Sequence, residues 1–188
     1  MHTLIDKLKE GNRRFVSGLP ESFKTQLSAR KETAKQQKPQ VIILSCADSR
    51  VIPETIFDAS IGELFVVRVA GNVANKSTIA SIEFAVTQLK SRLIVVLGHQ
   101  NCGAVSAAID NQDLGPHLNH LISGIKRGLN IREEKPDLHE AFKINTKYSA
   151  LSLKKESAII SEKCKNDSLR IVTAYYELDS GIVFFEEG

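Results

Sequence analysis

Short apolar runs alternate along this chain with segments whose apolar residues recur at helical spacing. Three runs rich in β-branched residues predict strands buried on both faces, as in a parallel sheet, and they cover residues 41–44, 64–69 and 93–97. Two more strands, 170–176 and 182–185, flank Asp179-Ser180-Gly181 and predict a hairpin. Helices are predicted over residues 4–16, 29–37, 104–109, 118–129 and 141–165, and after the capping pair Ser77-Thr78.

This order of elements predicts an α/β fold, because strands separated by helices form a mainly parallel sheet flanked by helices. Helices stand at the N-terminal end and strands at the C-terminal end. The chain has 188 residues, 42% of them hydrophobic and 25% charged, which is an ordinary mixture for a globular protein. We therefore expect a single domain over residues 1–188 with one substantial core.

The charge pattern argues against several classes of partner. The net charge is only +3, and no stretch combines Lys and Arg with aromatic residues, so nucleic acid is not an expected partner. Charged Asp6 and Lys7 come too early for the apolar core of a signal peptide. The longest apolar run, around 93–97, is far too short to span a membrane. We expect a soluble, cytoplasmic protein.

The candidate chemistry lies in two short segments, each of which follows a predicted buried strand. Cys46, Asp48 and Arg50 follow the first strand, and His99 and Cys102 follow the third. Binding sites in open parallel sheets form beyond the carboxyl ends of the strands. If the two strands are neighbours, these five side chains converge on one crevice.

Two cysteines and one histidine are a ligand set for catalytic zinc. Thiolates and a neutral imidazole would occupy three tetrahedral positions and leave the fourth open. We expect Gly98 to allow a tight turn before His99, and a helix that starts at Cys102-Gly103 to favour the thiolate of Cys102. Arg50 is close enough in sequence to hold the carboxylate of Asp48 by charge-assisted hydrogen bonds.

Other interpretations of these residues stay open. A lone Cys46 would more often be a buried core thiol, and only its combination with the His99-x-x-Cys102 segment favours a metal. Asp48 either orients the reacting oxygen or rotates in as a fourth ligand and closes the site. Cys164, in the polar stretch Glu162-Lys163-Cys164-Lys165, is interpreted as having no part in the site.

At these residues the chain closely resembles the β-class carbonic anhydrases. The signature of that family is Cys-x-Asp-x-Arg followed much later by His-x-x-Cys, and both parts are present. The resemblance covers nearly the whole chain. It includes Gly11-Asn12-Arg13-Arg14-Phe15, Phe65-Val66-Val67-Arg68, Ala70-Gly71-Asn72, Ser81-Ile82-Glu83-Phe84-Ala85 and Ala174-Tyr175-Tyr176-Glu177-Leu178.

The resemblance implies one Zn²⁺ per chain, held by Cys46, His99 and Cys102, with Asp48 and Arg50 as the catalytic pair. It divides the domain into a helical arm, 1–37, and a zinc-binding core, 38–188. The arm is expected to embrace a second subunit in a homodimer or a dimer of dimers. The substrate pocket, completed across that interface, is expected to contain Gln37, Phe65, Phe84 and Gly103.

Two positions bear on how this chain differs from its family. Phe84 stands where the family often has tyrosine, so a hydroxyl is missing from the pocket. Ile43 stands where the bicarbonate-regulated branch has tryptophan, so we predict no such regulation. Arg68 matches an arginine of that regulatory site, but without its partner we expect it to form a structural ion pair.

The predicted reaction is the reversible hydration of carbon dioxide to bicarbonate and a proton, by attack of zinc-bound hydroxide. Two thiolates place extra negative charge on the metal, so we expect it to lower the pKa of a bound water molecule less strongly. Hydration should therefore be faster at alkaline pH. Four histidines are candidate proton relays: His2, His117, His120 and His139. The alternatives are hydrolysis of carbonyl sulfide or carbon disulfide at the same site, a zinc-dependent scaffold without turnover, and redox-active cysteines, although no Cys-x-x-Cys motif is present.

Overall fold

A five-stranded sheet forms the centre of the computed structural model, which describes residues 3–110, 112–130 and 137–186, without the side chains of residues 23 and 25. The strand order is β2-β1-β3-β4-β5. The first four strands are parallel: β1 (Val41–Ser45), β2 (Leu64–Arg68), β3 (Leu93–His99) and β4 (Arg170–Tyr176). Strand β5 (Val183–Glu186) runs antiparallel to β4, so the predicted terminal hairpin and the mainly parallel sheet are both confirmed.

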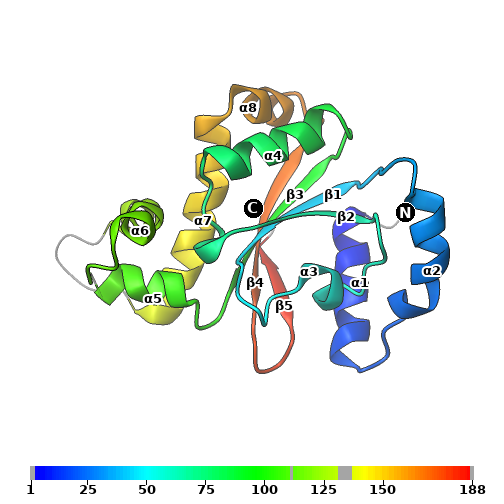
Figure 1. Cartoon of the computed structure of the whole chain (residues 1–188), viewed down its shortest axis with the longest axis horizontal. Coiled ribbons are helices and arrows are strands. Elements are labelled where there is room, and N and C mark those ends of the chain that lie inside the picture. The colour runs from blue at the N-terminus through cyan, green and yellow to red at the C-terminus, as the bar shows by residue number, and fades with distance from the viewer. Residues whose placement is uncertain (1–2, 111, 131–136, 187–188) are drawn as a thin grey trace.

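Helices cover both faces of this sheet (Figure 1). Helices α1 (Leu4–Val16) and α3 (Pro53–Ile56) pack on one face, and α2 (Ser22–Thr33) lies beyond α1. The other face carries five helices and a short 3₁₀ turn, η1 (Ala70–Asn72). The five are α4 (Lys76–Thr87), α5 (Gly103–Asp110), α6 (Pro116–Leu129), α7 (Leu138–Glu156) and α8 (Ala158–Lys165).

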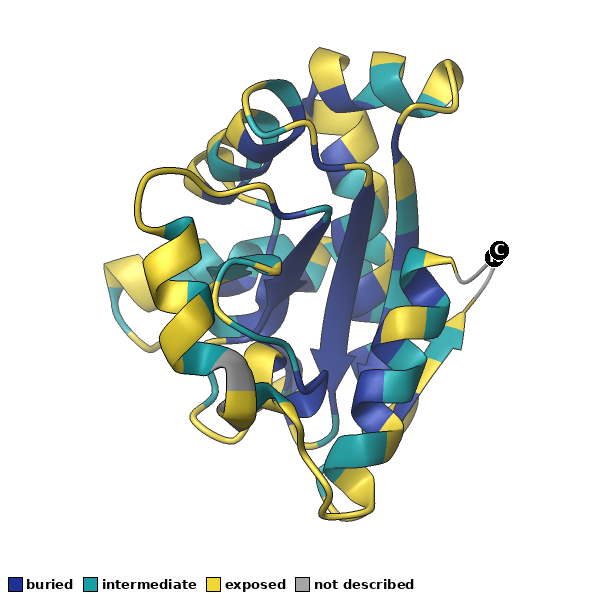
Figure 2. Ribbon diagram, turned by 90° about the vertical axis from the view of Figure 1, so that its right-hand side faces the viewer, coloured by how far each residue is buried: buried dark blue, intermediate teal, exposed yellow. Residues whose placement is uncertain are grey.

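The alternation of side chains along β1 shows why its first four residues are all apolar. Ile43 packs with Ile5 and Leu8 of α1 on one face. Its neighbours Ile42 and Leu44 pack with α4, α7 and α8 on the other face. Since successive strand residues point to opposite faces, a strand covered on both sides must be apolar at every position. Strands β1 and β3 are buried at every position and belong to the dark blue centre of Figure 2, whereas the edge strand β2 is only partly buried.

The second helix does not lie where the local pattern placed it. It covers Ser22–Thr33 rather than 29–37. The first helical N–H groups, those of Glu21 and Ser22, donate to the carboxylate of Asp58 at 3.0 and 2.9 Å. The start of the helix is therefore determined by a side chain that comes more than thirty residues later.

Two other helix boundaries differ from the prediction. The expected helix 141–165 is divided at Ser157, which has extended backbone angles (φ −118°, ψ 111°). The Ser157 hydroxyl accepts from the N–H of Ile160 at the start of α8 and donates to Glu83 of α4 at 2.6 Å. Helix α4 is capped by Asn75, whose side chain accepts from the N–H groups of Ser77 and Thr78, so the expected Ser77-Thr78 cap is wrong.

Asp58 fastens the N-terminal helices to the sheet domain. Its side chain is fully buried and forms an ion pair with Arg14 of α1. Burial by itself would raise the pKa of the Asp58 carboxyl, but the Arg14 guanidinium and the N–H groups of Glu21 and Ser22 outweigh burial and lower the pKa to about 2. The ionised carboxylate thus stabilises the folded state.

We expect Asp58→Asn to lower the free energy of unfolding at pH 7 by about 2 kcal/mol. The folded pKa of about 2 lies below the ordinary value of 3.8, so this contribution is present above about pH 4 and is lost as the pH falls toward 2. Urea unfolding at several pH values should show that the free energies of unfolding of the wild type and Asp58→Asn become equal in acid. The exposed control Asp110→Asn should leave stability nearly unchanged, and a difference for Asp58→Asn that did not shrink in acid would contradict the assignment.

Among the described helices, none combines the length and the apolar character that crossing a membrane would require.

Candidate metal centre

The two segments that carry the candidate ligands meet because β1 and β3 are neighbours. The strands are parallel, and Ser45 pairs with Leu97. Cys46 follows β1 directly, and His99 is the last residue of β3. The expected adjacency of the two strands is therefore confirmed, and both segments leave the sheet at the same edge.

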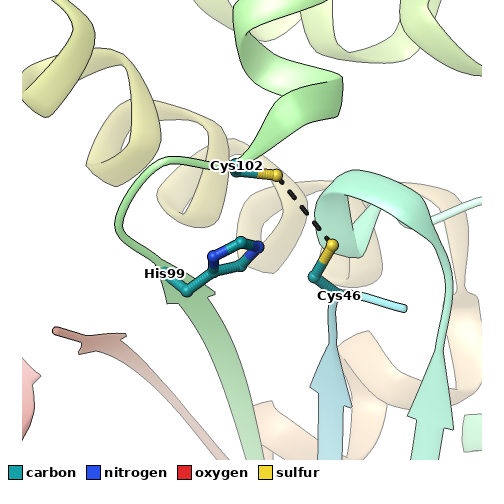
Figure 3. A group of neighbouring side chains, drawn as sticks. All are labelled: Cys46, His99 and Cys102. Carbon is teal, nitrogen blue, oxygen red and sulfur yellow. Dashed lines mark hydrogen bonds between the residues drawn. The ribbon is translucent and has the colours of Figure 1, made fainter. Parts of the chain in front are cut away.

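Cys46, His99 and Cys102 form a compact buried cluster (Figure 3). Their potential ligand atoms all lie within 4.8 Å of one another, and the two sulfurs are 3.9 Å apart. Across residues 3–110, 112–130 and 137–186, no other group of three such residues lies this close. Cys164, in α8, is a partly buried free thiol outside the cluster.

The imidazole of His99 has one nitrogen engaged and one without a partner. Nδ1 lies 2.7 Å from the carbonyl oxygen of Gln100, to which it donates in the tautomer that leaves a lone pair on Nε2. Nε2 is buried and has no hydrogen-bond partner among the described residues. A buried polar atom normally has a partner, so this lone pair beside two sulfurs fits a metal ligand.

The two sulfurs hold one negative charge easily and a second only with difficulty. The Cys102 thiol donates to the Cys46 sulfur, and the N–H groups of Asp48 and Gly71 donate to it as well. These bonds lower the pKa of Cys46 well below its ordinary value against the effect of burial. The nearby Cys46 sulfur and burial raise the pKa of Cys102. The N–H groups of Ala104 and Val105 at the start of α5 act in the expected direction on Cys102 but are outweighed. A divalent cation between the sulfurs would replace the remaining proton, so the donor set fits a metal.

Asp48 and Arg50 form a bidentate ion pair beside the cluster. Arg50 Nε donates to Oδ1 at 3.0 Å and Nη2 donates to Oδ2 at 2.8 Å, while the Arg50 N–H also reaches Oδ1 at 3.0 Å. These donors, Arg50 first, keep the pKa of Asp48 well below its usual range. The carboxylate is outside the group of close ligand atoms and is held by Arg50.

Arg68 supports the same segment through its backbone. Its guanidinium donates to the carbonyl oxygens of Cys46 at 3.1 Å and Asp48 at 2.7 Å. The expectation of an ion pair was therefore wrong, since the described partners of Arg68 are two carbonyls. By binding the carbonyl oxygens of Cys46 and Asp48, Arg68 fixes the backbone between the thiol and the carboxylate. The position of Arg68 in the sequence gave no indication of this role.

Gly98 is required for a reason that differs from the predicted turn. It lies within β3, and its φ is not in the left-handed region. A Cβ atom at Gly98 would lie 1.9 Å from Oγ1 of Thr146 in α7. Glycine at this position lets α7 approach the strand that ends in His99.

The predicted pocket residues lie in different parts of the chain. Gly103 begins α5 beside Cys102 and is exposed. Gln37 is exposed before β1, at the opposite end of that strand from Cys46. Phe65 pairs with Ile42, four residues before Cys46, which corresponds to roughly 13 Å along the strand. Phe84 of α4 is 48% exposed, with its ring 6.4 Å from that of Phe65. Within one chain, only Gly103 adjoins the cluster.

Comparison with known proteins gives a consistent result. The family model described as "Carbonic anhydrase" matches residues 41–183. "Carbonic anhydrase 2" of Mycobacterium tuberculosis is 40% identical over 180 residues, which cover 93% of this chain and 87% of the relative. The carbonic anhydrase of Mycolicibacterium smegmatis is 46% identical over 108 residues, covering 57% and 52% of the two chains.

Solved structures show the same fold. One is from a study of two tetrameric β-carbonic anhydrases of Sordaria macrospora, with a TM-score of 0.76 and 23% identity, covering 88% of this chain and 90% of that one. Another is Coccomyxa β-carbonic anhydrase in complex with acetazolamide, with a TM-score of 0.73, 23% identity, and coverage of 98% and 86%.

Proposed function

We propose that this chain, which belongs to the β-carbonic anhydrase family, hydrates carbon dioxide reversibly with a zinc ion held by Cys46, His99 and Cys102. The observation that carries the proposal is the buried Nε2 of His99, which has no hydrogen-bond partner among the described residues and lies within 4.8 Å of two buried sulfurs. Two thiolates and one imidazole suit tetrahedral zinc and leave one position for a reactant. Zinc bound there would supply the nucleophile by lowering the pKa of a water molecule.

Asp48 orients that nucleophile in the proposed reaction. Because Arg50 keeps the pKa of Asp48 low, the carboxylate is ionised at neutral pH and acts as a hydrogen-bond acceptor. A carboxylate with so low a pKa does not retain a proton, so the proton released in hydration passes on to solvent. The exposed position of Arg50 places this pair where the buried cluster meets solvent.

The surroundings of the cluster suit a small apolar substrate. Cys46 and Cys102 pack in a hydrophobic cluster with buried Val73 and Val105. Low polarity around the sulfurs strengthens each electrostatic interaction and limits competition from bulk water. Carbon dioxide, which has no net dipole, needs little more than an apolar seat next to the nucleophile.

The proposed active form is a homo-oligomer. The Sordaria relatives are described as tetrameric, and β2 occupies one edge of the sheet with no strand on its outer side among the described residues. Gln37 and Phe65 lie near the end of β1 opposite Cys46, and Phe84 contacts Phe65, so we assign the three to the pocket of a second subunit. A dimer or a dimer of dimers would satisfy this arrangement.

Stopped-flow hydration of carbon dioxide by the zinc-loaded protein tests the proposal. The rate should rise between about pH 6.5 and 9, because the nucleophilic oxygen must lose a proton before it attacks. Turnover no faster than buffer at every pH, with zinc confirmed by elemental analysis, would overturn the assigned substrate. Parallel assays with carbonyl sulfide and carbon disulfide would then identify hydrolysis of an isoelectronic substrate at the same site.

A further inference from the structure

Helix α7 touches both halves of the candidate metal centre through consecutive residues. Asn145 Nδ2 donates to the carbonyl oxygen of Gly71 at 2.9 Å, and the N–H of Gly71 donates to the Cys46 sulfur at 3.3 Å. Thr146 lies against Gly98, the residue before His99. A single turn of α7 therefore lies against both ligand segments, and it is Asn145 that is joined to a ligand atom by hydrogen bonds. Valine at position 146 would keep the shape that packs against Gly98.

The hydrogen bond from the Gly71 N–H to Cys46 depends on a contact that holds the Gly71 backbone in place. Gly71 has φ +67°, a conformation that glycine adopts without steric cost, and its carbonyl and N–H belong to two peptide planes that meet at Cα. Glycine rotates more freely about these bonds than any other residue. A hydrogen bond that holds the carbonyl therefore limits the rotation that would turn the N–H away from Cys46.

Burial makes asparagine an unfavourable residue at position 145 unless its amide has a specific partner. Asn145 is 1% exposed, and its Oδ1 has no hydrogen-bond partner among the described residues. An unpaired buried amide oxygen destabilises the folded state, and an apolar side chain would remove that oxygen but leave the buried Gly71 carbonyl without this donor. The hydrogen bond to Gly71 is a contact that an apolar residue could not make, so it accounts for the asparagine.

We propose that Asn145 is a positioning residue for the metal centre. It holds Gly71 so that the Gly71 N–H stays directed at the sulfur of Cys46, which keeps that ligand oriented toward His99 and Cys102. The proposal rests on the proposed function only in that the cluster binds a metal. Loss of a group that orients a metal ligand typically weakens metal affinity by about tenfold to a hundredfold.

The test compares Asn145→Leu with Thr146→Val. Thr146→Val removes the hydroxyl that donates to Phe142 at 2.8 Å but leaves the Asn145–Gly71 bond in place. Affinity for Zn²⁺ is measured by competition with a chelator, and the cysteine ligands are followed by the Co²⁺–thiolate charge-transfer absorption. Urea unfolding of the metal-free proteins separates metal affinity from stability. Asn145→Ala provides a second variant if leucine does not pack.

We expect Asn145→Leu to bind Zn²⁺ about tenfold to a hundredfold more weakly and to alter the Co²⁺ band. The Gly71 carbonyl loses its donor, so the metal-free protein should lose about as much stability as Thr146→Val, which also gives up one buried hydrogen bond. Thr146→Val should be less stable but bind metal as the wild type does. Unchanged affinity in the Asn145 variants, or losses of affinity that merely follow losses of stability in all variants, would overturn the proposal. If the wild type binds metal, Asn145→Leu binds it weakly and neither hydrates carbon dioxide, the positioning role stands and the proposed function fails.

Discussion

The Cys46→Ser variant should lose its metal and at least about a thousandfold of its carbon dioxide hydration activity. A serine hydroxyl stays protonated at neutral pH, so it does not replace the Cys46 thiolate, whose pKa its hydrogen bonds lower. Only His99 and Cys102 would remain as ligands, too few to retain the ion. Elemental analysis after dialysis and stopped-flow hydration would measure the two losses.

The third cysteine provides a matched control for this substitution. Cys164 is a free, partly buried thiol on α8 and is not a member of the cluster. Cys164→Ser should therefore keep both the metal and the hydration rate. Retention of metal and activity in Cys46→Ser, or their loss in Cys164→Ser, would show that the ligands have been assigned to the wrong cysteines.

The Asp48→Asn variant should keep its metal but lose about a hundredfold to a thousandfold in kcat/KM. Asparagine has nearly the shape of aspartate, so the three ligands are undisturbed. The amide, however, carries no charge, loses the bidentate pairing with Arg50 seen at 3.0 and 2.8 Å, and offers one acceptor oxygen instead of two. The nucleophile would lose the anionic acceptor that orients it.

Metal content and kinetics must be measured together for Asp48→Asn. Asp113→Asn, in the loop after α5, removes an exposed carboxylate whose partners are Asn119 and Gly115, and it should leave kcat/KM unchanged. A loss of metal in Asp48→Asn would indicate that the carboxylate serves as a ligand. Full activity with full metal content would contradict its role as acceptor.

The central sheet and the ligand segments were predictable because both are encoded locally. A strand covered on both faces is apolar along most of its length, and residues 41–44 and 93–97 show that pattern directly in the sequence. Reactive residue types placed just after such strands indicate a site at the carboxyl edge of the sheet. The remaining condition was that these two strands be neighbours, which the pairing of β1 with β3 satisfies.

Helix boundaries were less predictable because remote side chains determine them. Helix α2 begins where Glu21 and Ser22 donate to Asp58, 36 residues beyond Ser22. The break between α7 and α8 is supported by the bond from Ser157 to Glu83, 74 residues away. A pattern of apolar positions within a short window contains no information about either partner.

The sequence by itself determined the fold class, the terminal hairpin and the identity of the candidate ligands, because these depend on residue type and local spacing. Only the tertiary structure decided three contacts around the site. Glycine at position 98 leaves room for Thr146, and Arg68 donates to the backbone carbonyls of Cys46 and Asp48. Asn145 is linked to the Cys46 sulfur through the backbone of Gly71. Each of these contacts joins segments far apart in the chain. Their geometry depends on how α7 and β2 pack around β1 and β3, which no local pattern specifies.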